Sequence, residues 1–133
     1  SPTLVTGGQL STLAFYTNNY GTGGGPRGIV FDGTSIWTAN MVGSVSKINP
    51  STGALIGTYS LPTGAAPYGI AFDRTSIWTA NSGGNSVSKI DVASGAVINT
   101  YPVGTNPQLI AFDGTNIWVT NSGSATVTKI QAR

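Results

Sequence analysis

The chain lacks three residue types that carry much of protein chemistry: its 133 residues include no cysteine, no histidine and no glutamate. Without cysteine there is no disulfide framework and no thiol catalysis. Without histidine there is no histidine general base, and the usual zinc ligand sets cannot be assembled. No apolar run approaches the roughly 20 residues of a membrane-spanning helix. We therefore expect no cofactor, no bound metal ion, no membrane insertion and no enzymatic activity.

Charge is also scarce, since charged residues make up 8% of the chain, against about a quarter in a typical globular protein. Six Lys and Arg against four Asp give a net charge of +2. Binding to nucleic acid requires several basic side chains on one surface. Lys47, Lys89 and Lys129 instead recur once per repeat, which spreads them around the molecule. We interpret them as solvated repeat positions and expect no nucleic-acid partner.

Glycine, serine, threonine and asparagine are abundant, and hydrophobic residues make up 39% of the chain. That hydrophobic content is too high for a disordered chain. Good helix formers are few and β-branched and turn residues many, which favours strands over helices. A low-charge surface of small polar residues suits a secreted or cell-surface protein. The opening residues SPTLVTGG show no basic region followed by an apolar core, so we expect no signal peptide within them.

Three segments of the chain repeat one another, and this repeat indicates the fold. They read PRGIVFDGTSIWTANMVGSVSKI from Pro26, PYGIAFDRTSIWTANSGGNSVSKI from Pro67 and PQLIAFDGTNIWVTNSGSATVTKI from Pro107. The period is 41 and then 40 residues, measured between Trp37, Trp78 and Trp118. A period near 40 with several short strands is typical of a β-propeller blade.

The middle unit shows the four strands of one blade. We expect strands over Gly69–Asp73, Ile77–Asn81, Ser86–Asp91 and Ala96–Val103. Gly, Asn, Asp and Ser lie between these runs, where hairpin turns need unusual backbone angles. The predicted fold class is therefore all-β, with blades of four antiparallel strands.

The outer units differ from the middle one in which strands they contain. The third unit stops after its third strand, while Leu10–Thr17 reads as a lone strand before the first unit. Aligned back from the blade prolines, that lone strand occupies fourth-strand positions. We expect a single propeller segment over residues 1–133. Its parts are an outer strand and linker at 9–25, blade units at 26–66 and 67–106, and a unit without its outer strand at 107–133.

Three blades are too few to close a ring, because propellers typically have about four to eight. We expect identical chains to close the ring together, with the N-terminal strand of one chain paired to the last blade of its neighbour. A homodimer would give six blades and a homotrimer nine. The usual range of blade number favours six.

The segment IWTANSGGNSVSKIDVASGAVINTYPVGTNP resembles the YVTN-type β-propeller repeat, and the likeness covers about residues 26–130. This resemblance implies a binding or scaffold module of the kind found in bacterial and archaeal surface-layer and secreted proteins. A related propeller group includes streptogramin lyases, which use histidine with a bound magnesium ion. The chain has no histidine, so the resemblance does not imply lyase activity here. The second strand also departs from the family's name, reading Ile-Trp-Thr-Ala-Asn.

Aromatic and acidic residues recur at fixed repeat positions, and we assign both sets to structure. We expect six aromatic residues to pack between blades rather than to stack on sugar rings: Trp37, Trp78, Trp118, Phe31, Phe72 and Phe112. Asp32, Asp73 and Asp113 begin hairpin turns, where aspartate accepts backbone hydrogen bonds. Equivalent turns lie on different blades, too far apart to share a calcium ion. We interpret Asp91, beside a second hairpin, in the same way.

Ligand contacts are predicted at two sets of residues on one face of the propeller. Arg27, Tyr68 and Gln108 each follow a blade proline and differ from one another while their neighbours repeat. Neutral drift is the alternative explanation of that variation. Asn40, Asn81 and Asn121 end the second strand of each unit, before loops on the same face. Binding residues commonly lie on loops of a rigid frame.

The predicted function is a non-enzymatic, self-assembling propeller that acts as a scaffold or as a lectin-like binding module for carbohydrate or another polar ligand. The alternative is a purely architectural ring without a ligand, either a natural fragment or an engineered one. A lyase-like enzyme ranks third. The glycine run Gly21–Gly25 lacks the Lys-Ser/Thr of a phosphate-binding loop and precedes a strand, so it reads as a connection between strands.

Overall fold

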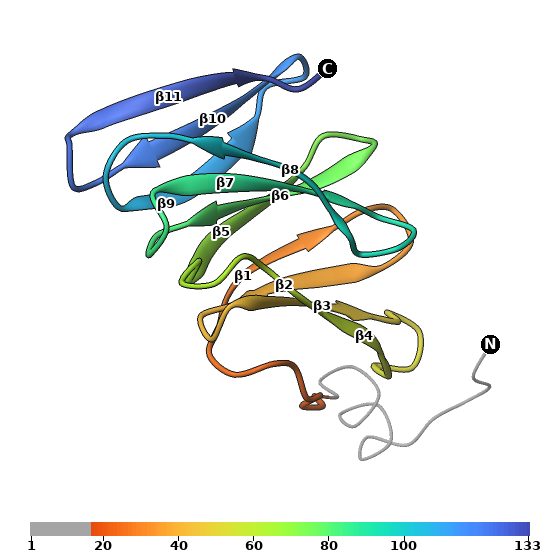
Figure 1. The fold of residues 1–133 in the computed structure, drawn as a ribbon. Coiled ribbons are helices and arrows are strands. Elements are labelled where there is room, and N and C mark those ends of the chain that lie inside the picture. Colours follow the sequence, from red (N-terminus) through yellow and green to blue (C-terminus); the bar gives the residue numbers. More distant parts are fainter. Residues whose placement is uncertain (1–16) are drawn as a thin grey trace, which may run out of the picture.

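The computed structural model describes residues 17–133 and folds them into three antiparallel sheets (Figure 1). The first sheet contains β1 (Pro26–Phe31), β2 (Ile36–Asn40), β3 (Ser44–Ile48) and β4 (Leu55–Ser60). The second contains β5 (Pro67–Phe72), β6 (Ser76–Asn81), β7 (Ser86–Asp91) and β8 (Val97–Pro102). The third contains β9 (Pro107–Phe112), β10 (Asn116–Asn121) and β11 (Thr126–Gln131). We call these sheets blades 1, 2 and 3.

The strands of the middle blade follow the sequence-based expectation closely. β7 has the predicted bounds, while β5 ends at Phe72, one residue before its predicted end. Asp73 is excluded from β5 because it belongs to the turn, where its backbone N–H donates to the carbonyl of Ser76. The strand predicted at Leu10–Thr17 lies outside the described residues except for Thr17, which is not in a strand.

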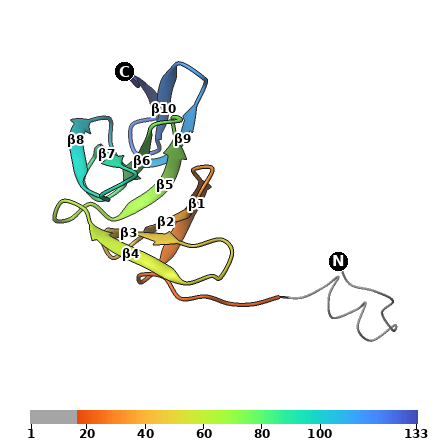
Figure 2. The ribbon, with the colours of Figure 1, turned by 90° about the vertical axis from the view of Figure 1, so that its right-hand side faces the viewer.

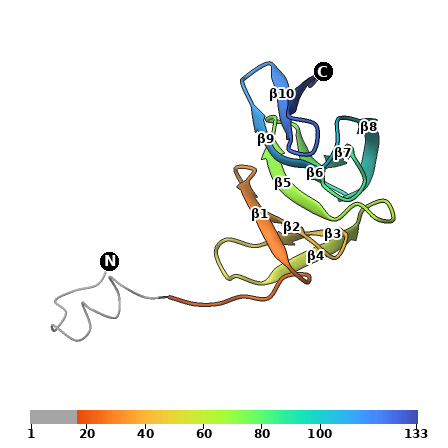
Figure 3. The same ribbon diagram turned by 90° about the vertical axis from the view of Figure 1, so that its left-hand side faces the viewer.

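The blades follow one another along an arc, with their first strands on one side (Figures 2 and 3). β1 contacts β5, and β5 contacts β9. Glycine permits this close approach, because a Cβ at Gly28 would lie 2.5 Å from the carbonyl oxygen of Tyr68. A Cβ at Gly69 would lie equally close to the carbonyl oxygen of Gln108. The inner strands of adjacent blades therefore meet backbone to backbone.

An apolar core fills each of the two junctions between blades. At the first junction, Trp37 of β2 packs with Ile77 and Ile90 of blade 2. At the second, Trp78 of β6 packs with Ile117 and Val119 of blade 3. Both tryptophans are fully buried, which confirms the packing predicted for them.

Two of the predicted core aromatic residues are exposed within the described chain. Trp118 is 38% exposed and Phe31 is 54% exposed. Each lies on a blade face that points away from the other two blades, at opposite ends of the arc. Phe72 and Phe112, which face an adjacent blade, are half-buried at the cores. The single chain thus leaves Trp118 and Phe31 unpacked, whereas the prediction that all six pack between blades was made for a closed ring.

Within residues 17–133, no helix is long and apolar enough to cross a membrane.

Candidate functional site

The residues that follow the three blade prolines lie on consecutive inner strands. Arg27 is exposed, and Tyr68 and Gln108 are partly exposed. The guanidinium carbon of Arg27 lies 5.0 Å from the centre of the Tyr68 ring, which is cation–π geometry. Gln108 holds the same position on β9, the strand that contacts β5. The structure thus brings a cation, an aromatic ring and an amide to one end of three adjacent strands.

The three strand-ending asparagines are not available to a ligand, which corrects the sequence-based prediction. Asn40, Asn81 and Asn121 are at most 1% exposed. In blade 2, the Nδ2 of Asn81 donates to the hydroxyls of Ser86 (3.1 Å) and Ser88 (2.9 Å). Its Oδ1 accepts from the hydroxyl of Thr79 at 2.9 Å. The amide joins β6 to β7 inside the blade, and Asn40 does the same in blade 1.

Blade 3 carries the same amide with one partner missing. The Nδ2 of Asn121 donates to Thr126 and Thr128, but its buried Oδ1 has no hydrogen-bond partner among the described residues. The position that supplies a threonine hydroxyl in the other blades is occupied by Val119. The replacement of threonine by valine therefore explains the unsatisfied oxygen.

The repeated aspartates are structural, as predicted, and each has a partner that the sequence analysis did not identify. The Oδ1 of Asp73 accepts the backbone N–H groups of Thr75 (2.8 Å) and Ser76 (2.7 Å). Its Oδ2 accepts the indole N–H of Trp78 at 2.8 Å. The same indole bond forms between Trp37 and Asp32 and between Trp118 and Asp113. The constant spacing of five residues from Asp to Trp was the available signal.

These hydrogen bonds hold the aspartates in their charged form. Burial raises the pKa of Asp73, but hydrogen bonds from Trp78, Ser76 and Thr75 outweigh it and leave the pKa below its usual range. The pKa of Asp32 is lowered in the same way, against a similar effect of burial. At the more exposed Asp113, the backbone N–H of Asn116 and the Trp118 indole lower the pKa to about 2. Carboxyl groups this acidic are poor proton donors near neutral pH.

The repeated lysines contact tryptophan and, at two of three positions, the next blade. The Nζ atoms of Lys47 and Lys89 lie 5.3 Å from the ring centres of Trp37 and Trp78. Lys47 also donates to the carbonyl of Val92 at 2.8 Å, and Lys89 to that of Ala132 at 3.1 Å. These two lysines link blades, so the interpretation of all three as merely solvated positions was wrong.

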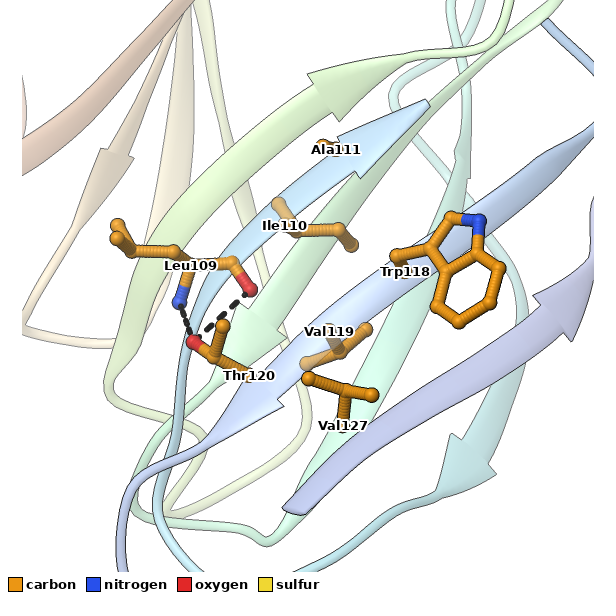
Figure 4. Close-up of a pocket in the computed structure, with 7 residues that line it drawn as sticks. All are labelled: Leu109, Ile110, Ala111, Trp118, Val119, Thr120 and Val127. Carbon is orange, nitrogen blue, oxygen red and sulfur yellow. Dashed lines mark hydrogen bonds between the residues drawn. The ribbon is translucent and has the colours of Figure 1, made fainter. Parts of the chain in front are cut away.

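Each end of the arc presents an apolar hollow. On blade 3, the hollow is lined by Leu109, Ile110, Ala111, Trp118, Val119, Thr120 and Val127 (Figure 4). The hydroxyl of Thr120 bonds to the backbone of Leu109 there. On blade 1, the hollow is lined by Tyr20, Thr22, Ile29, Ile36, Thr38, Ile48, Asn49, Pro50 and Gly53. Among the described residues, no acidic or basic side chain lines either hollow.

No group of three or more acidic, cysteine or histidine side chains that could hold a metal ion occurs in the part of the chain that the structure describes. The four aspartates of the chain lie in separate turns. The described residues therefore offer polar and aromatic side chains for contact with a ligand, and their acidic side chains do not cluster.

Comparison with solved structures shows a β-propeller-like fold. The hydrazine synthase of Kuenenia stuttgartiensis matches with a TM-score of 0.75 and 24% identity, over 88% of this chain and 35% of that chain. A streptogramin B lyase matches with a TM-score of 0.62 and 26% identity, over 79% and 40%. Saccharomyces cerevisiae Sqt1 matches with a TM-score of 0.67 and 13% identity, over 77% and 28%. This chain thus spans less than half of the length of each. No family model and no curated protein matches the sequence.

Proposed function

We propose that this chain is a non-enzymatic propeller module that assembles with identical copies into a closed ring and binds a polar ligand, such as a carbohydrate, beside its inner strands. The observation that supports ligand binding is the row formed by Arg27, Tyr68 and Gln108. These three residues differ on a frame that otherwise repeats. A tyrosine ring and flanking donors suit sugar hydroxyls and ring faces.

The residue types present support a binding role over catalysis. The chain contains no histidine, cysteine or glutamate, and its aspartates are engaged in turns. One structural neighbour is a virginiamycin B lyase described as catalytically inactive after a histidine was changed to alanine. Paired carboxyl groups for glycoside cleavage would need one acid with a raised pKa. The pKa of each of the four aspartates is lowered instead.

A purely architectural ring is the second candidate, and the buried asparagines favour it. Three of the six residues expected to contact a ligand serve the internal hydrogen bonding of the blades. On this alternative, the variation among Arg27, Tyr68 and Gln108 is neutral drift. The repeat type itself, YVTN-like on the residues quoted above, is compatible with both functions.

A glycan array combined with thermal-shift measurements separates the two candidates. The binding hypothesis predicts that Tyr68→Ala and Arg27→Ala each weaken a detected interaction by tenfold or more. Thr34→Ala, an exposed turn residue at the opposite end of β1, is the matched control and should bind normally. Failure to detect any glycan or polar ligand with an intact oligomer would favour the architectural ring.

A further inference from the structure

The residues just before blade 1 repeat the layout that precedes blade 3. Residues 18–26 read NNYGTGGGP, and residues 99–107 read NTYPVGTNP. Each tyrosine stands six residues before its blade proline. The Nδ2 of Asn18 donates to the hydroxyl of Tyr20 at 3.0 Å, as that of Asn99 donates to Tyr101 at 3.2 Å. Tyr20 therefore corresponds to the tyrosine of a fourth strand, which shifts the fourth-strand register two residues later than the alignment that gave Leu10–Thr17.

The contact that Tyr20 makes with blade 1 supports this correspondence. In blade 2, the turn glycine Gly95 lies against the ring of Tyr59, the fourth-strand tyrosine of the preceding blade. In blade 1, the equivalent glycine Gly53 lies against the ring of Tyr20 in the same way. Tyr20 occupies, on blade 1, the place that the tyrosine of a preceding blade occupies on blade 2.

Blade 3 is the blade whose tryptophan has no tyrosine partner within the described residues. Tyr59 lies 5.9 Å from Trp37 and Tyr101 lies 5.7 Å from Trp78, measured between ring centres. Trp118 holds the same position on β10, and β11 is paired only with β10 among the described strands. One end of the arc thus carries a fourth-strand tyrosine, and the other carries a tryptophan that needs one.

We propose that Tyr20 of one copy stacks on Trp118 of a second copy, with the backbone around Asn19 paired to the free edge of β11. This inference rests on the self-assembly proposed above and specifies its surface. It makes Tyr20 part of two blades at once: the ring contacts its own blade 1 and completes blade 3 of the neighbour.

The two open faces also match the first internal junction at five apolar positions. At the first internal junction, Trp37 and Val45 of blade 1 face Ile70, Ile77 and Ile90 of blade 2. On the outward face of blade 3, Trp118 and Val127 occupy the positions of Trp37 and Val45. On the outward face of blade 1, the positions of the three isoleucines of blade 2 are occupied by Ile29, Ile36 and Ile48. The occupant that fits each face is accordingly another copy of this chain.

A lysine and a backbone carbonyl complete the match. Lys47 and Lys89 bond to the carbonyls of Val92 and Ala132 in the next blade. By the repeat, Lys129 of one copy should bond to the carbonyl of Pro50 in the second copy. Lys129 already lies 5.6 Å from the centre of the Trp118 ring, so its ammonium group is directed as in the other blades.

Leu109 makes the approach of the inner strands at the junction between copies different from that at the internal junctions. Gly28 and Gly69 allow inner strands to touch, whereas Leu109 stands at the equivalent position of β9 and is 59% exposed. A leucine side chain cannot fit where a Cβ alone would lie 2.5 Å from a carbonyl oxygen. The junction between copies must therefore be wider near the ring axis, with Leu109 filling the added space against Ile29 of the second copy.

Disulfide cross-linking tests the proposed register, because the native chain has no cysteine. Ser46 pairs with Thr58, and Ser88 pairs with Thr100. The equivalent pair across the copies is Thr128 with Asn19. Under mild oxidation, the double variant Asn19→Cys/Thr128→Cys should convert most of the protein into covalent dimers or trimers that reducing agent dissolves.

The matched control is Asn19→Cys/Thr126→Cys, which moves one cysteine by two residues on the same face of β11. Both Thr126 and Thr128 bond to Asn121, so the two variants lose a comparable hydrogen bond. The control pair should cross-link at least about fivefold less. An internal disulfide in a single chain would overturn the proposal. An intact oligomer without cross-links would overturn this register while leaving self-assembly standing.

A second variant examines the stacking itself. Tyr20→Ala should raise the dissociation constant of the oligomer by about tenfold or more, because it removes both the aromatic pair and the apolar area that the ring would bury. Tyr20→Phe retains the ring and should largely restore assembly. Equal dissociation constants for the alanine variant and the native chain would contradict the contact with Trp118.

Discussion

Blade 2 and blade 3 share most of their sequence, yet within the described residues blade 2 has both faces covered and blade 3 only one. Trp78 is fully buried and lies 5.7 Å from Tyr101, while Trp118 is 38% exposed. Both indoles donate to an aspartate five residues earlier, and both rings lie near a lysine. The surroundings of the two indoles are therefore alike within β6 and β10, and what differs is the fourth strand and the following blade, which blade 3 lacks among the described residues.

The largest effect should come from truncating the two tryptophans in turn. Trp78→Ala should lower the free energy of unfolding by about 3–5 kcal/mol, because it leaves a cavity between two blades. Trp118→Ala should cost less than about 1 kcal/mol in the dissociated chain, where the ring is already partly in water. Urea denaturation at low protein concentration measures both values.

At high protein concentration, where the chain is expected to be oligomeric, Trp118→Ala should in addition weaken the oligomer. If the two substitutions cost the same in the dissociated chain, blade 3 is covered by something within the chain itself. The contrast between the blades would then be wrong.

A second prediction concerns the turn aspartates. Asp73→Ala removes the acceptor of two backbone N–H groups and of the Trp78 indole, so it should lower the free energy of unfolding by about 2–3 kcal/mol. Asp113→Ala should cost less, because its turn is exposed. Equal losses at the two positions, measured by urea denaturation, would show that burial of the turn does not matter.

Acid should destabilise the native chain through these same groups. The pKa of Asp113 is about 2 in the folded chain, against about 3.9 for an unperturbed aspartate. A lowered pKa contributes stability above the unfolded value, and that contribution is lost as the pH falls toward 2. The thermal midpoint should therefore be flat from pH 7 to about 5 and fall below about 4. A midpoint that rises on acidification would contradict the assigned hydrogen bonds.

Restoring the missing hydroxyl in blade 3 should make it more like blade 2. Val119→Thr offers the buried Oδ1 of Asn121 the partner that Thr79 gives Asn81. We expect a gain of about 1 kcal/mol, since an unsatisfied buried acceptor costs about 1–3 kcal/mol and the loss of a methyl group offsets part of it. The reverse change, Thr79→Val, should destabilise blade 2. A loss of stability for Val119→Thr would contradict this explanation of the unsatisfied oxygen.

The smallest effect should come from a turn position at which blade 2, unlike the other blades, has a strained backbone conformation. Arg74 has a φ of 80°, while Gly33 and Gly114 hold the equivalent positions in the other blades. Arg74→Gly should raise the free energy of unfolding by about 0.5–1 kcal/mol, because glycine relieves the strain of the left-handed region. Loss of the cation–π contact with Phe112 reduces the gain. Gly33→Ala, the converse change, should destabilise blade 1.

Much of the blade could be predicted from the sequence because its signals are local. The alternation of β-branched residues and turn residues predicted β7 without error, and the Asp-x-Thr turns predicted the role of Asp73. What the sequence analysis missed depends on neighbours in space. The side-chain amides of the buried asparagines form hydrogen bonds with hydroxyl groups on the adjacent strand. Asparagine is also common in loops, so its position at the end of a strand did not indicate these bonds.

The ends of the arc were also beyond local reasoning. Repetition predicted the same packing for Trp118 as for Trp78, but in the single chain no fourth strand and no following blade lie beside Trp118 among the described residues. Leu109 occupies the position that Gly28 and Gly69 hold in the other blades. The consequence of this difference follows only from the structure, where the inner strands approach closely at those glycines. The two residues that interrupt the repeat on this face, Leu109 and Thr120, lie at the junction proposed between copies.

The most direct test of the account is the mass of the native 13.5 kDa chain in solution, determined by light scattering across a range of concentrations. Self-assembly predicts a discrete particle of two chains, or of three if the ring has nine blades, which dissociates on dilution or when Tyr20 is replaced by alanine. A particle with the mass of one chain at every concentration would contradict it.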